Sequence, residues 1–90
     1  MQQAHIFISG FVQGVGFRRF IKKNAENLGI VGWVRNTRDN KVEALFQGSE
    51  KNIKTVIMVS GKGPFLAEIK NLEVIREDIK EDFRDFRIIT

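Results

Sequence analysis

The chain has 90 residues and no cysteine, and its 15 Lys and Arg against 11 Asp and Glu give a net charge of +4. This length predicts a single domain, residues 1–90, with a modest core. No apolar stretch approaches the ~20 residues of a membrane span, and the first five residues lack the basic and apolar regions of a signal peptide. Without cysteine, a disulfide framework and thiolate chemistry are excluded, so we expect a cytoplasmic protein.

The single histidine and the absence of cysteine leave little for a zinc site, and no ligand spacing for another metal is visible. We therefore expect no cofactor. Charges of both signs are interspersed, as in Arg84-Asp85-Phe86-Arg87, rather than gathered in blocks. The positive excess thus indicates solubility and attraction for small anions. The charge allows a nucleic-acid partner but does not require one; we expect none, no membrane association, and a monomer.

The most informative stretch is Gly10-Phe11-Val12-Gln13-Gly14-Val15-Gly16-Phe17-Arg18, which lies between a short apolar run and a stretch with helical periodicity. It predicts a strand, a glycine-rich turn and a helix start. Glycine permits positive φ and a close approach to a ligand. The N–H groups of such a turn and of the helix N-terminus can bind an anion, and Arg18 adds a guanidinium fork. The alternative is that the glycines only permit a tight connection between the strand and the helix and bind no ligand.

The first half of the chain predicts one helix and three strands. Residues 5–11 are rich in Ile and Phe and predict the first strand. Residues 17–28 carry an apolar stripe at helical spacing, with Gly29 placed to end the helix. Residues 30–37 and 42–47 predict a hairpin. Asp39-Asn40 would close it as a two-residue turn, since Asp and Asn tolerate the left-handed conformation.

The second half predicts a helix that begins after Ser49 and ends at Gly61 and Gly63, followed by strands at residues 67–76 and 83–89. The apolar phase slips at Lys70-Asn71, which predicts a β-bulge. The resulting order, β-α-β-β-α-β with a short fifth strand at the C-terminus, predicts a ferredoxin-like α+β sandwich. Its sheet would be antiparallel, with both helices on one face.

A second stretch, Gly32-Trp33-Val34-Arg35-Asn36, lies on the second predicted strand. In this topology the first and second strands end at the same edge of the sheet. Asn36 can therefore face the glycine-rich turn. Because an amide both donates and accepts hydrogen bonds, Asn36 could hold a water molecule beside a bound phosphate.

Over essentially its whole length the chain resembles the acylphosphatases, small enzymes that hydrolyse the mixed anhydride of a carboxylic acid and phosphate. The glycine-rich stretch matches the first signature of the family at every specified position. The stretch from Gly32 to Asn36, with Val42 and Gly48 beyond it, matches the second signature. One departure is Asn40, which stands where the family has a turn glycine, and we expect the hairpin to tolerate it.

The resemblance implies metal-independent hydrolysis of small-molecule acyl phosphates, with inorganic phosphate as a product. Arg18 would bind the phosphate, and Asn36 would orient the attacking water. The backbone amides that would form the phosphate cradle are those of Gln13, Gly14, Val15, Gly16 and Phe17.

Two other kinds of protein suggest alternative functions. The RNA recognition motif has the same element order, but residues 42–47 contain one aromatic residue and an acid where that motif needs a basic residue, glycines and two aromatics. Larger carbamoyl-transferring maturation proteins carry a similar N-terminal module. Because no zinc-finger cysteines follow the last predicted strand, we expect a free-standing enzyme.

Three conspicuous side chains are expected to lie outside the chemistry. Arg19 is about 100° further round the helix than Arg18, which predicts a solvated position. His5, at the start of the first predicted strand, is expected to be structural or exposed, and Trp33, on the second, is expected to contribute to packing.

Overall fold

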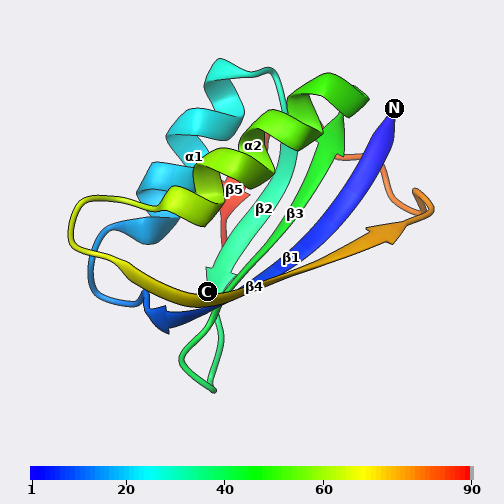
Figure 1. Ribbon diagram of the computed structural model, residues 1–90. Coiled ribbons are helices and arrows are strands. Elements are labelled where there is room, and N and C mark those ends of the chain that lie inside the picture. The colour runs from blue at the N-terminus through cyan, green and yellow to red at the C-terminus, as the bar shows by residue number, and fades with distance from the viewer. Residues whose placement is uncertain (90) are drawn as a thin grey trace.

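The computed structural model describes residues 1–89 and shows two helices covering one face of a five-stranded sheet (Figure 1). The elements in chain order are β1 (Gln2–Phe11), α1 (Phe17–Asn27), β2 (Val31–Asn36), β3 (Val42–Gly48), α2 (Glu50–Lys62), β4 (Glu68–Glu77) and β5 (Phe86–Ile88). Every predicted element is present. The largest differences in bounds are at the first strand, which begins earlier than predicted, and the last, which is shorter.

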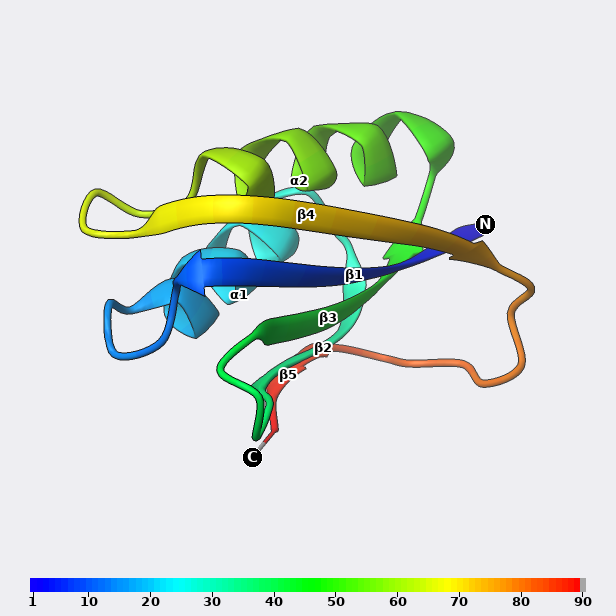
Figure 2. The same cartoon turned by 60° about the horizontal axis from the view of Figure 1, so that its bottom comes forward.

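The strand order across the sheet is β4-β1-β3-β2-β5. The four long strands pair in antiparallel fashion, which confirms the predicted ferredoxin-like arrangement. The sheet as a whole is mixed, however, because β5 runs parallel to β2, with Phe86 opposite Gly32. A connector, residues 78–85, carries the chain from β4, the outer strand on one side of the sheet, to β5, the outer strand on the other side (Figure 2). As a result, the C-terminal end of β5 lies at the same end of the sheet as the C-terminal ends of β1 and β2.

The core lies between the helices and one face of the sheet. Alternate residues of the strands face the helices, because successive side chains of a strand point to opposite faces. The helices contribute residues at helical spacing, as their apolar stripes predict. The fully or nearly fully buried apolar residues of strands and helices are Ala4, Ile6, Ile8, Val34, Val42, Ala44, Phe46, Phe86, Phe17, Ile21, Ala25, Ile53 and Val56.

The turn between β2 and β3 differs from the predicted two-residue hairpin. Thr37 N–H donates to the Lys41 carbonyl at 2.9 Å, and Lys41 N–H donates to the Thr37 hydroxyl at 3.0 Å. The loop therefore has three residues, Arg38, Asp39 and Asn40. Three-residue hairpins need their left-handed residue last, and Asn40 supplies it with a φ of 66°. The Thr37 hydroxyl also donates to Asp39 and holds the pKa of that carboxyl below its ordinary value.

Two further local expectations were tested by the structure. Ser9 pairs with Asn71, but Gly10 pairs with Ile69, so Lys70 is the extra residue of the predicted bulge. The second helix continues through Gly61 to Lys62, which corrects the prediction that Gly61 takes part in ending it. Gly63 ends the helix alone, because its φ of +69° leaves the right-handed helical region.

Gly32 permits the close approach of β2 to β3, and replacing it should destabilise the fold. A methyl group at Gly32 would lie 1.9 Å from the Leu45 carbonyl oxygen, and its φ of +140° is strained for any L side chain. We expect Gly32→Ala to lower the free energy of unfolding by about 3 kcal/mol or more in urea titrations. Gly61→Ala is the matched control, since helical Gly61 has ordinary space for a methyl group and should gain up to about 1 kcal/mol. Equal stabilities of the two variants would contradict this account.

Candidate active site

The loop between β1 and α1 presents unpaired backbone donors. Gly14 and Gly16 have positive φ values of 75° and 77°. Among residues 1–89, no acceptor is found for the backbone N–H groups of residues 13–17. Both glycines are exposed, so these donors remain accessible to a ligand. Successive N–H groups in a loop with alternating left-handed residues form an anion-binding concavity.

The N-terminus of α1 is left without the usual compensation for its positive end. Gly16 occupies the N-cap position and makes no side-chain cap, and the first turn contains no acidic residue. It contains Arg18 and Arg19 instead. Cations at a helix N-terminus are unfavourable by about 0.3–1 kcal/mol each. A sequence that keeps this local conflict is expected to use it at a functional site, here for an anion.

A pocket of about 330 Å³ joins this helix end to β2. Its lining residues are Val12, Gly14, Gly16, Phe17, Arg18, Arg19, Asn36 and Ile88. Arg18 and Asn36 thus line one pocket although they lie 18 positions apart in the sequence. Both side chains are partly buried, and neither has a hydrogen-bond or ion-pair partner among residues 1–89. Two polar side chains in such a pocket are available to a ligand.

The pocket includes most but not all of the residues predicted for the site. Gln13 and Val15 do not line it. The Gln13 side chain bonds to the β2–β3 hairpin instead, and Val15 packs against the edge of the core.

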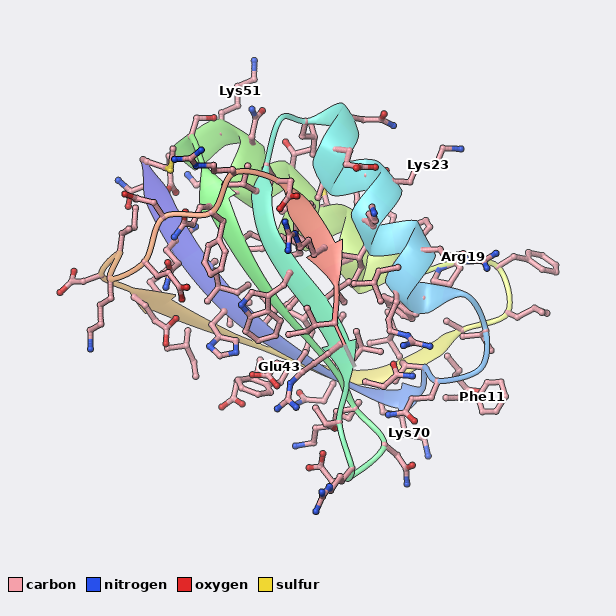
Figure 3. All side chains as sticks on the ribbon, turned by 180° about the vertical axis from the view of Figure 1, so that it is seen from behind. Phe11, Arg19, Lys23, Glu43, Lys51 and Lys70 are labelled. Atoms are coloured by element: carbon pink, nitrogen blue, oxygen red, sulfur yellow. The ribbon has the colours of Figure 1, made fainter. Side chains whose placement is uncertain are left out.

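Three lining residues were not predicted for the site: Val12, Arg19 and Ile88. Arg19 is exposed, as predicted for a solvated residue, and Figure 3 shows it projecting outward from α1. It nevertheless contributes to the rim, which its adjacency to Arg18 could have indicated. Ile88 reaches the pocket because β5 lies beside β2, and the strand pattern carries no signal for that pairing.

The opposite face of the sheet carries a structural charge network. Glu43 is 7% exposed and accepts from His5 Nε2 at 2.6 Å and from Arg35 Nε at 2.7 Å (Figure 3). The His5 ring meets Trp33 edge to face at 5.6 Å. A buried carboxylate needs such partners, so this cluster is explained by packing and ion pairing. The predicted structural roles of His5 and Trp33 agree with these contacts.

A larger pocket of about 480 Å³ lies on this second face, beside the connector. It is lined by Trp33 and Phe83, and by the acidic residues Glu77, Asp78 and Glu81. Lys80 is the one basic residue in its lining. This charge disfavours a phosphate, so the smaller pocket at Arg18 is the better anion site despite its size.

Among residues 1–89, no group of three or more His, Cys, Asp or Glu side chains is placed to hold a metal ion. None of the helices in this part of the chain combines the length and the apolar character that crossing a membrane requires.

Comparison with known proteins identifies the family of the chain. The family model for acylphosphatase matches residues 4–88. The chain belongs to the acylphosphatase family. It is 42% identical over 90 residues to an acylphosphatase of Pyrobaculum aerophilum, with 99% of this chain and 95% of the relative covered. The acylphosphatase is therefore a hydrolase that acts on acid anhydrides.

Solved structures support the same assignment. The crystal structure of acylphosphatase from Bacillus subtilis superimposes with a TM-score of 0.97 at 31% identity, with 100% of both chains covered. The structure of HypF from T. kodakarensis matches with a TM-score of 0.87 at 32% identity. There the match covers 99% of this chain but 12% of the HypF chain, so an acylphosphatase-like fold also occurs within a much longer protein.

Inorganic phosphate should stabilise this acylphosphatase by occupying the pocket. At ten times its Kd, a ligand that binds only the native state adds about 1.4 kcal/mol, a rise in Tm of several degrees for a domain of this size. We expect this rise in calorimetry of the wild type and its loss in Arg18→Ala. Lys23→Ala is the control, because it removes the same charge from an exposed position of the same helix. An equal rise with chloride at matched ionic strength would count against a specific site.

Proposed function

We propose that this acylphosphatase hydrolyses the carboxyl–phosphate bond of small-molecule acyl phosphates in the pocket between Arg18 and Asn36. The family implies this substrate class. The observation that carries the assignment to this pocket is the meeting of three features. They are the unpaired amides of Gly14, Gly16 and Phe17, the Arg18 guanidinium and the Asn36 amide.

The chemistry of an acyl phosphate suits this site. Its leaving group is a carboxylate, which departs without protonation, so a strong general acid is unnecessary. The lining of the pocket accordingly contains no His, Asp or Glu side chain. What the enzyme must supply is positioning and neutralisation of charge on the phosphoryl group, which account for most of the catalysis in phosphoryl transfer.

Each part of the site has a role in this mechanism. The cradle amides and Arg18 hold the phosphoryl oxygens and stabilise the charge of a loose transition state. Asn36 holds a water molecule in line with the departing carboxylate. As water adds to phosphorus, its proton passes to a phosphate oxygen of the substrate, and the products are the carboxylate and inorganic phosphate.

Removing either polar side chain should abolish most of the activity without unfolding the protein. We expect Arg18→Ala and Asn36→Ala each to lose at least ~10²-fold in kcat, the scale for one preorganised electrostatic group. Arg18→Lys should remain poor, because an ammonium does not reproduce the guanidinium fork. The measurement is phosphate release from benzoyl phosphate, with Tm recorded for each variant. Near-full activity in either alanine variant would remove that residue from the mechanism.

The same mechanism predicts insensitivity to chelators. Arg18, the cradle amides and the helix dipole supply the positive field that Mg²⁺ supplies in many phosphoryl-transfer enzymes. Phosphate release in excess EDTA should therefore equal that in untreated enzyme. A loss of activity that added Mg²⁺ or another divalent cation restores would show that the proposed mechanism is incomplete.

Several properties remain predictions from the sequence. They are a single domain over residues 1–90, a monomeric state, a cytoplasmic location and the absence of a nucleic-acid partner.

A further inference from the structure

We infer that the Gln13 side chain is a positioning residue, which fixes Asn36 relative to the phosphate cradle. Gln13 Nε2 donates to the Thr37 carbonyl and to the Lys41 carbonyl, both at 2.9 Å. Two carbonyl acceptors use both hydrogens of the amide and determine its orientation. The inference rests on the proposed roles of the cradle and of Asn36.

The two halves of the site need such a link because they are not neighbours in the sheet. The cradle follows β1 and Asn36 ends β2, and β3 lies between these strands. Two interstrand spacings separate them, about 9.6 Å at that edge. Among residues 1–89, the two bonds from Gln13 are the side-chain hydrogen bonds that join the cradle loop to the hairpin. The distance from cradle to Asn36 therefore depends on them.

The acceptors of Gln13 are also the residues that define the hairpin next to Asn36. Thr37 follows Asn36 directly, and its N–H already donates to the Lys41 carbonyl at 2.9 Å. The Thr37 carbonyl already accepts from Asn40 N–H at 3.4 Å. Both carbonyls thus have a hairpin partner without Gln13. The side chain is not required to satisfy them, and its distinctive effect is to join two separate elements.

The expected consequence is a loss of turnover rather than of phosphate binding. The cradle amides and Arg18 remain when the Gln13 side chain is replaced, so affinity for phosphate should change little. Asn36 would lose its fixed position, and a misplacement of about 1 Å can cost 10²-fold in rate. A residue that only stabilises the fold would not lower turnover while leaving the affinity for phosphate unchanged.

Gln13→Met tests the inference, because methionine has similar length and no charge but donates no hydrogen bond. We expect kcat on benzoyl phosphate to fall about tenfold to hundredfold, with KM and the Kd of inorganic phosphate within about threefold of wild type. Asn52→Leu is the matched control. Asn52 Nδ2 donates to the Leu28 carbonyl at 2.9 Å and joins the two helices away from the pocket. The Asn52→Leu substitution should lower Tm and leave kcat unchanged.

A double-mutant cycle shows whether Gln13 acts through Asn36. In the Asn36→Ala background, Gln13→Met should reduce kcat by less than about twofold, because the group that it positions is already gone. A full additional loss there would overturn the inference. So would a kcat near that of wild type in Gln13→Met alone, or a rise in the Kd of phosphate as large as the loss in kcat.

A spectroscopic measurement separates this inference from the proposed function. The NMR resonances of the Asn36 side-chain amide should shift or broaden in Gln13→Met and stay unchanged in Asn52→Leu. Unchanged Asn36 resonances in Gln13→Met would refute the link even if every variant hydrolysed substrate. Wild-type enzyme that released no phosphate from acyl phosphates would refute the proposed function and with it the catalytic role of Gln13. In that case, altered Asn36 resonances in Gln13→Met would show only that the Gln13 side chain contacts the hairpin.

Discussion

The site depends on an uncompensated positive end of a helix. In most helices a side-chain oxygen caps the first N–H groups, and acidic residues are favoured in the first turn. At the start of α1 this chain has a glycine cap, two arginines and a loop whose N–H groups have no acceptor among residues 1–89. An anion with several oxygens can accept hydrogen bonds from these N–H groups and neutralise the positive charge of the arginines at the same time. This is the reason for proposing that the phosphoryl group of the substrate binds at this helix end.

The rest of the fold serves to place a second group beside that helix end. β1 and β2 run in the same direction with β3 between them, so the cradle and Asn36 lie at one edge of the sheet. Gly32 lets β2 approach β3 closely enough for this arrangement. The Gln13 side chain then spans the remaining gap to the hairpin. In the proposed mechanism, the sheet sets the approximate distance between the cradle and Asn36, and the Gln13 side chain refines it to the precision that catalysis requires.

Charge divides the molecule into two different faces. The pocket at α1 is lined by two arginines and no acidic residue, whereas the larger pocket beside the connector is lined by Glu77, Asp78 and Glu81. The buried Glu43 on the open face of the sheet is held by His5 and Arg35. The sign of the local charge, rather than the size of the cavity, is therefore the reason for proposing the smaller pocket as the site of a negatively charged substrate.

The sequence by itself determined the order of the elements and the glycine-rich turn, because these follow from local periodicity and turn chemistry. Arg18 and Asn36 were predicted as the polar pair of the site from their resemblance to the family's signatures, and their roles stay a proposal. Only the tertiary structure decided the three-residue hairpin, the parallel β5 that brings Ile88 to the pocket, and the contacts of the Gln13 side chain. These depend on which strands become neighbours and in what register. That choice is made by packing over the whole domain, and no local pattern of residues records it.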